Sequence, residues 1–224
     1  MRYQTVLFDL DGTLLDHLPA IHRSYAYTLP QLGRPAPTRE QVRRAIGGGL
    51  EDAMRRFVPE ADLSRALAIY RAYWDRTMLA GVELMPGAGE LLRTLQARGW
   101  TLAVLTNKHG PSSRRVCEHL GIAPLLRGVF GALDTPWLKP DPRLTAHVFT
   151  TLGADPATAC LVGDSPFDAE TARQGGLPAF LVTTGTHSAD ELRAAGAEHI
   201  YPDLATLARA AFAIELSRPA TTVL

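Results

Sequence analysis

The chain has 224 residues, enough for one large domain or for a core with a smaller appendage. Hydrophobic residues make up 46% of it, which excludes a chain that stays disordered because it cannot bury a core. Basic and acidic residues balance at 23 each, so the net charge is zero, and neither a nucleic acid nor an anionic membrane surface is expected as a partner.

The N-terminal residues show no export signal. Met1 to Gln4 lead directly into a strand-like run, without an apolar segment that ends in the small residues of a cleavage site. No apolar stretch of the sequence approaches the ~20 residues that span a bilayer. We therefore expect a cytoplasmic protein that does not contact a membrane.

Six short apolar runs predict buried strands, at 5–8, 101–105, 128–133, 159–162, 179–182 and 199–201. Their hydrophobicity is continuous rather than alternating, which is typical of strands covered on both faces, as in a parallel sheet. Helical patterns lie between them, at 87–98, 111–120, 142–152, 166–174 and 204–214. Pro111, Pro142 and Pro166 fit the first turn of three of these helices. This alternation predicts a doubly wound, Rossmann-like parallel α/β sheet.

Residues 16–82 interrupt the alternation, because they contain no convincing strand. Residues at helical spacing, all apolar except Thr28, predict helices there instead: Ile21, Tyr25, Thr28, Leu29 and Leu32 in one set, and Leu63, Leu67, Tyr70, Trp74 and Met78 in another. We interpret both sets as internal packing rather than as a cofactor site. The predicted organisation is an all-helical cap at 16–82 inserted into an α/β core at 1–15 and 83–224. The tail at 217–224 is expected to be frayed.

Polar residues follow four of the predicted strands, and ligands of parallel sheets bind where strands end at their carboxyl side. The residues are, in chain order, Asp9 and Asp11, Thr106 and Asn107, Lys139, and finally Asp164 and Asp168. Each has an ordinary explanation by itself: a capping pair, a structural threonine, a surface lysine or a turn. Their joint occurrence, each after a strand, predicts a site.

The residue types of this predicted site favour phosphoryl chemistry. Converging carboxylates repel one another unless a cation joins them, and Mg²⁺ is the hard, oxygen-liganded ion that also binds phosphate. A carboxylate is a competent nucleophile toward phosphorus, and of two acids such as Asp9 and Asp11 one can attack while the other handles protons. Lys139 would place a charge on phosphoryl oxygens, and Thr106 a hydrogen bond. Lys108 and Lys139 are the only two lysines of the sequence.

The sequence resembles the haloacid dehalogenase superfamily in four segments: Asp9-Leu10-Asp11-Gly12-Thr13, Thr106-Asn107, Lys139-Pro140, and Gly163-Asp164-Ser165 with Asp168. The helical insert resembles the cap of its phosphatases, most closely of phosphoglycolate phosphatase-like proteins. The resemblance implies that Asp9 is the nucleophile and that Asp11 is the acid and base, with its main-chain carbonyl on the metal. It also implies that Thr106, Asn107 and Lys139 hold the phosphoryl group. Asp164 would be a ligand of Mg²⁺, and Asp168 either belongs to the metal site or orients the lysine.

Three parts of the predicted cap remain open. Gly48 and Gly49 stand where related caps carry a substrate loop, and glycine allows close approach of the backbone to a ligand, but a flexible connection would have the same composition. Arg43 and Arg44 are candidates for binding a substrate carboxylate, or else side chains of a solvated helix face. His17 follows the first motif and is either a substrate contact or a solvated hinge residue.

The predicted function is Mg²⁺-dependent hydrolysis of a small phosphorylated metabolite, a phosphoglycolate-like phosphomonoester, through an aspartyl-phosphate. A sugar-phosphate mutase of the β-phosphoglucomutase kind is the first alternative. A non-catalytic receiver-like module, in which a phosphorylated aspartate is a signal, is the second. The sequence specifies neither the substrate nor whether the protein is a monomer or a homodimer.

Overall fold

The structure is a computed structural model that describes residues 3–217. Its central sheet has six parallel strands in the order β5-β4-β1-β6-β7-β8. The strands are β1 (Thr5–Phe8), β4 (Thr101–His109), β5 (Gly128–Ala132), β6 (Ala159–Gly163), β7 (Ala179–Val182) and β8 (His199–Tyr201). The predicted α/β class and parallel sheet are confirmed, and all six predicted runs are strands.

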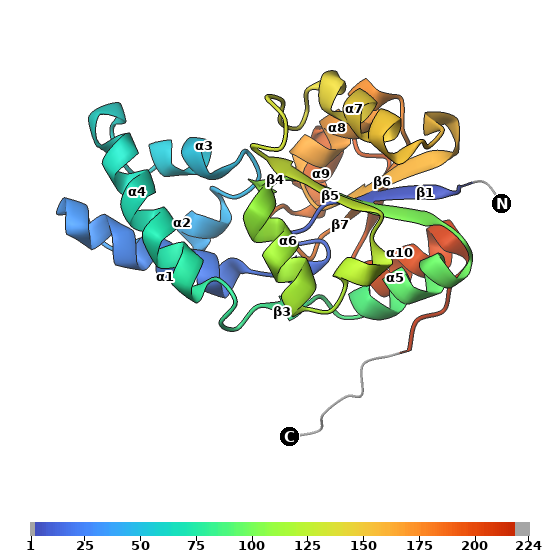
Figure 1. The fold of residues 1–224 in the computed structure, drawn as a ribbon, viewed down its shortest axis with the longest axis horizontal. Helices are drawn as coiled ribbons and strands as arrows, with labels where there is room; N and C mark the ends of the chain where they lie inside the picture. The colour runs from blue at the N-terminus through green and yellow to red at the C-terminus, as the bar shows by residue number, and fades with distance from the viewer. Residues whose placement is uncertain (1–2, 218–224) are drawn as a thin grey trace.

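Helices cover both faces of the sheet (Figure 1). One face carries α5 (Ala88–Ala97), α6 (Gly110–His119) and α10 (Leu204–Phe212), and the other carries α7 (Pro142–Leu152), α8 (Pro166–Gly175) and α9 (Ala189–Ala194). Successive residues of a strand point to opposite faces, so Val6 and Phe8 pack toward the first set of helices and Leu7 toward the second. This double coverage explains why the strands read as continuous apolar runs.

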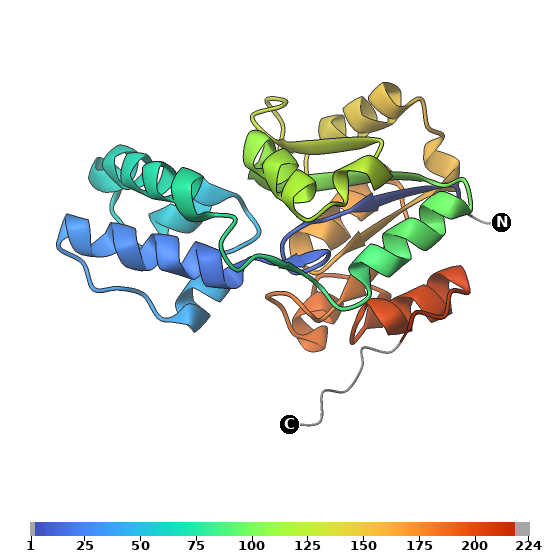
Figure 2. The same cartoon turned by 60° about the horizontal axis from the view of Figure 1, so that its bottom comes forward.

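A group of helices lies at one end of the sheet, beyond the strand termini (Figures 1 and 2). It comprises α1 (Leu18–Thr28), a 3₁₀ turn at Leu29–Leu32, α2 (Arg39–Arg43), α3 (Leu50–Arg55) and α4 (Glu60–Thr77). The two predicted apolar sets meet inside it, where Tyr25 packs against Tyr70 with ring centroids 5.1 Å apart. These apolar residues therefore form a small core of their own, as the spacing indicates.

A short ribbon lies where the chain leaves and re-enters the core. Its strands are β2 (Leu15–Asp16) and β3 (Glu83–Leu84), which pair antiparallel. The sequence does not predict this ribbon, because two residues are too few for any periodicity. Most of the tail predicted to fray, at 218–224, lies outside the described residues, while Ser217 donates hydrogen bonds to Glu90.

Candidate active site

Four strand ends bring the predicted residues to one edge of the sheet. Asp9 follows β1 directly and Asp164 follows β6, while Lys139 lies in the loop after β5. Strand β4 differs from the prediction, since it continues to His109 after a register shift and so contains Thr106 and Asn107. Parallel neighbours end at the same edge, so these side chains converge although they lie far apart in the sequence.

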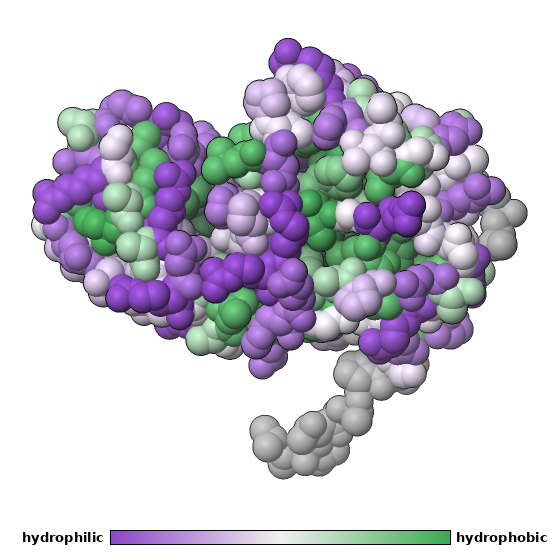
Figure 3. All heavy atoms as spheres, in the orientation of Figure 1, coloured by the Kyte–Doolittle hydropathy of each residue, from purple (hydrophilic) through white to green (hydrophobic). Residues whose placement is uncertain are grey.

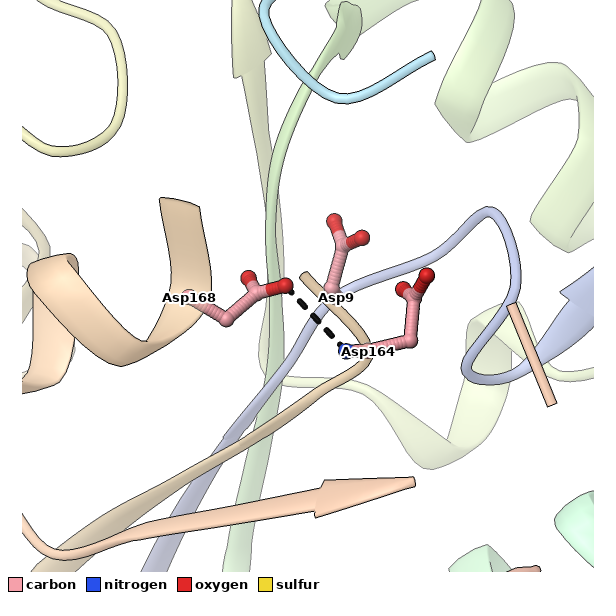
Figure 4. A group of neighbouring side chains, drawn as sticks. All are labelled: Asp9, Asp164 and Asp168. Atoms are coloured by element: carbon pink, nitrogen blue, oxygen red, sulfur yellow. Dashed lines mark hydrogen bonds between the residues drawn. The ribbon is translucent and has the colours of Figure 1, made fainter. Parts of the chain in front are cut away.

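Three buried carboxylates face one another at this edge (Figure 4). Asp9, Asp164 and Asp168 each offer an oxygen atom, and these oxygens all lie within 4.8 Å of one another. Burial raises the pKa of Asp9 to about 6, opposed by Lys139 and reinforced by Asp168. Burial, followed by the charges of Asp9 and Asp168, holds the pKa of Asp164 well above its usual range. Such a group of like charges has the donor set and spacing to hold one divalent cation.

Lys139 is the cation of this group. Its ammonium donates to Asp9 Oδ1 at 2.8 Å and to Asp168 Oδ1 at 2.7 Å, and the side chain is buried. Burial alone would lower the pKa of Lys139, but the carboxylates of Asp168 and Asp9 outweigh it and raise that pKa. The interpretation of Lys139 as an ordinary surface lysine is therefore wrong.

Asp168 joins Lys139 to the loop after β6. While Oδ1 accepts from the lysine, Oδ2 accepts from the Ser165 hydroxyl at 2.6 Å and from the main-chain nitrogen atoms of Ser165 and Asp164. A side chain at Gly163 would overlap Asp168, so this turn requires glycine. Of the two roles implied for Asp168, this geometry provides the lysine-orienting one.

Asn107 and Thr106 are both buried beside Lys139. The Asn107 amide donates to the carbonyl oxygens of Lys139 at 3.1 Å and of Gly47 at 3.0 Å, and its own oxygen accepts from the Lys139 main chain at 2.7 Å. Asn107 thus fixes the lysine loop and touches the cap. Thr106 Oγ1 accepts from the main chain of Lys108 at 3.3 Å and lines the cavity described below.

Asp11 lies outside the group of three acids and has different partners. Lys108 donates to both of its oxygens, at 2.7 and 3.0 Å. Burial would raise the pKa of Asp11, but the ammonium of Lys108 lowers it well below its usual range. The sequence alone assigns no role to Lys108. Its position after Thr106-Asn107, as one of two lysines, is the signal that could have identified it.

His17 is buried, so the solvated-hinge interpretation is wrong. Its Nε2 lies 2.6 Å from the carbonyl oxygen of Met78 and must carry the proton to donate to it, while Nδ1 faces Asp11 at 3.5 Å. Burial, and then the charge of Lys108, lowers the pKa of His17, which favours the neutral ring. Nδ1 of that tautomer is an acceptor directed at Asp11.

A cavity of about 480 Å³ opens between the cap helices and the sheet edge. Asp9, Asp11 and Thr106 line it from the core, and the glycine segment 47–49 lines it from the cap. Gly47 and Gly49 have φ of 130° and 94°, a backbone conformation that side chains disfavour. Gly48 and Gly49 are thus placed beside the candidate site.

The two cap arginines face elsewhere. Arg43 donates to the carbonyl oxygen of Gly185 in the loop after β7 at 3.2 Å, and Arg44 pairs with Glu40 of the cap and with Glu191 of α9. Neither is among the residues that line the cavity. Their contacts are structural bridges between cap and core.

Fold and site together define a capped, phosphate-handling α/β enzyme, and comparisons with known proteins identify its family. The family model for haloacid dehalogenase-like hydrolases matches residues 6–182. A protein named "Probable phosphatase IndB" from Dickeya dadantii is 34% identical over 93% of this chain and 94% of its own. A phosphoglycolate phosphatase from Rhodospirillum rubrum is 33% identical over 91% and 89%. A haloacid dehalogenase-like hydrolase structure from Streptococcus pneumoniae superposes with a TM-score of 0.81 at 27% identity, over 89% and 93%.

The chain therefore belongs to the haloacid dehalogenase-like hydrolase family. It is a phosphoric monoester hydrolase, similar to phosphoglycolate phosphatases. This confirms the resemblance stated from its motifs and replaces the receiver-like alternative with an enzyme. Within residues 3–217, no helix has the length and apolar character needed to cross a bilayer.

Proposed function

We propose that this enzyme is a Mg²⁺-dependent phosphatase that hydrolyses a small phosphomonoester through a phosphoryl-Asp9 intermediate. The observation that carries the proposal is the setting of Asp9. Its carboxylate lines the cavity, contacts the buried ammonium of Lys139, and lies within 4.8 Å of Asp164 and Asp168. A nucleophile toward phosphorus and a group that attracts phosphoryl oxygens thus stand side by side.

The carboxylate group fits a bound Mg²⁺. Among the described residues, Lys139 pairs with Asp9 and Asp168, but no ammonium or guanidinium forms an ion pair with Asp164. The negative charge of Asp164 therefore lacks a counterion that a divalent cation would supply. Asp9, Asp164 and the main-chain carbonyl of Asp11 would hold the ion, with Asp168 beside it. Bound there, Mg²⁺ would neutralise charge on the phosphoryl oxygens.

In the first transfer, an oxygen of Asp9 attacks phosphorus and the bond to the leaving-group oxygen breaks. Oδ1 of Asp9 is engaged with Lys139, so the other oxygen is the attacking one. Asp11 gives a proton to the leaving oxygen, which requires Asp11 to enter the step protonated. Nδ1 of the neutral His17 ring can accept a hydrogen bond from the protonated carboxyl group of Asp11.

In the second transfer, Asp11 takes a proton from water, the water oxygen attacks phosphorus, and the bond to Asp9 breaks. Lys108 keeps Asp11 in the carboxylate form that accepts this proton, because its ammonium stabilises that form. Phosphate leaves and the Asp9 carboxylate is restored. Thr106 and Lys139 hold the phosphoryl oxygens in both steps.

The test is phosphate release from phosphoglycolate, pyrophosphate and β-glucose 1-phosphate, with Mg²⁺ and with a chelator. We expect Mg²⁺-dependent release that the Asp9→Asn variant loses while it stays folded. Release that persists in that variant would contradict the role of Asp9. Conversion of β-glucose 1-phosphate to glucose 6-phosphate without release would establish the mutase alternative instead.

A further inference from the structure

The cap side of the cavity is apolar and aromatic. Side chains from α1, α3 and α4 line it above the candidate site: Ile21, Tyr25, Leu50, Tyr70 and Trp74. Tyr70 and Trp74 stack with ring centroids 5.9 Å apart, and Tyr25 meets the edge of Tyr70, so these rings form one rigid wall. A rigid aromatic wall binds apolar surface with little loss of side-chain entropy.

The core side of the cavity adds apolar groups that are otherwise left in solvent. Leu133 is 75% exposed and Leu138 is 38% exposed, and with Pro136 they line the mouth from the loop after β5. Leu133 also has a φ of 74°, a strained conformation for leucine. In Figure 3 apolar surface lies on the core beside its boundary with the cap. Apolar groups thus face the same cavity from both sides.

The charges of the cavity do not favour an anionic leaving group. Three basic side chains line the cavity, and each forms an ion pair with an acidic one: Lys108 with Asp11, Arg71 with Glu51, and Arg55 with Glu60. Asp52 and Asp75 line it as well and add negative charge. A carboxylate or second phosphate on the leaving group would share these cations with the acids that already pair with them, and it would approach Asp52 and Asp75.

We infer that this enzyme, acting as the phosphatase proposed above, prefers phosphomonoesters whose leaving group is uncharged and mainly apolar, an aryl-methyl or longer alkyl alcohol. Such a body fills the space between the aromatic wall and Leu133 while the phosphoryl group reaches Asp9. A two-carbon acid such as glycolate offers no apolar body to fill this space.

The test is a series of ethyl, propyl, butyl and hexyl phosphates with benzyl phosphate, whose leaving alcohols have similar acidity and so similar intrinsic reactivity. We expect kcat/KM to rise about fourfold per added methylene as each is buried. Phosphoglycolate should be slower than butyl phosphate, whose uncharged leaving group has the same number of non-hydrogen atoms. A flat series, or phosphoglycolate as the fastest substrate, would overturn the inference.

Two variants test whether Leu133 contributes to the preference for apolar leaving groups. Leu133→Ser should raise KM for hexyl phosphate about fivefold, with kcat and the ethyl phosphate reaction little changed, because it removes binding shared by ground and transition states. Tyr27→Ser is the matched control, since Tyr27 is a partly exposed apolar residue that stacks on Tyr73 and does not line the cavity. Equal effects of the two variants would contradict the inference.

The affinity for non-hydrolysable analogues tests this inference independently of the proposed function. The n-alkylphosphonates cannot be hydrolysed, and their affinity by titration calorimetry should rise with chain length in the same way. If affinity rises while no ester is hydrolysed, the cavity preference stands and the phosphatase proposal fails. If esters are hydrolysed while affinity stays constant along the series, the phosphatase stands and the preference fails.

Discussion

Replacing Asp164 by asparagine should stabilise the metal-free protein while it destroys metal binding. The carboxylate accepts hydrogen bonds from the Thr13 hydroxyl at 3.0 Å and the Thr186 main chain at 3.2 Å, and these are the hydrogen bonds recorded for its oxygens. An amide keeps both, because its oxygen can accept from Thr186 and its nitrogen can donate to Thr13, whose hydroxyl turns around. What the substitution removes is the negative charge.

The size of the effect follows from the spacing of the acids. The oxygens lie within 4.8 Å of one another, and two like charges at that upper limit repel by about 3–4 kcal/mol at an effective dielectric constant near 20, of which Lys139 offsets part. We expect a net gain of about 1–3 kcal/mol from Asp164→Asn. For a chain of this length, 1 kcal/mol corresponds to roughly 2–4 °C in Tm, so Tm should rise by several degrees.

The gain in stability from Asp164→Asn should depend on pH. The folded pKa of Asp164 is raised above its ordinary 3.8, so its carboxylate destabilises the folded state above that pH and no longer does so below it. Thermal unfolding in chelator should therefore show a stabilised variant at about pH 7 and equal proteins at about pH 4. Added Mg²⁺ should raise the Tm of the original protein and leave that of the variant unchanged.

Asp168→Asn is the matched control, four residues away. It breaks the ion pair with the buried Lys139, so it should destabilise the protein by about 3–5 kcal/mol, opposite in sign. If both variants lose stability in chelator, then Asp164 is not an uncompensated charge, and the argument for a cation there is wrong.

Three further predictions follow from the contacts of the site. Lys108→Met should raise the pKa of Asp11 and lower kcat by about 10–100-fold, with the acidic limb of the pH-rate profile moved to higher pH. Asn107→Ala removes the bonds that fix the Lys139 loop, so unfolding in urea should show a loss of about 1–3 kcal/mol and phosphate should inhibit more weakly. Without metal the pKa of Asp9 is about 6, so Mg²⁺ must compete with protons below that pH, and the Mg²⁺-induced rise in Tm should grow between about pH 5 and 7.

The sequence predicts the sheet well, because its strands are buried on both faces and appear as uninterrupted apolar runs. It fails where that signal is missing. The polar residues Thr106 to Lys108 hide the end of β4, and Ala189–Ala194 forms only a six-residue helix with a weak pattern. The ribbon of β2 and β3 depends on pairing between residues almost 70 positions apart, which no local pattern records.

For the site, the sequence likewise predicts positions at strand ends but not contacts between distant elements. Strand ends locate Asp9, Lys139 and Asp164, because sheet topology brings such positions together whatever the loops contain. Partners that come from different elements are not visible in the sequence: the burial of His17 under Trp74 and the pairing of Lys108 with Asp11 have no local signal. Both contacts depend on how the cap lies over the core, and that position is set by tertiary packing.

The most direct test of the central claim is the reaction of the Asp11→Asn variant with p-nitrophenyl phosphate and Mg²⁺. This leaving group needs no protonation, so Asp9 should still be phosphorylated, whereas the second transfer lacks its base. The account predicts a burst of one equivalent of nitrophenolate, followed by a stall, and a phosphoryl group found by mass spectrometry on the peptide that contains Asp9. The burst should be absent in chelator and in Asp9→Asn. Steady turnover without a burst, or a phosphoryl group on another residue, would contradict the account.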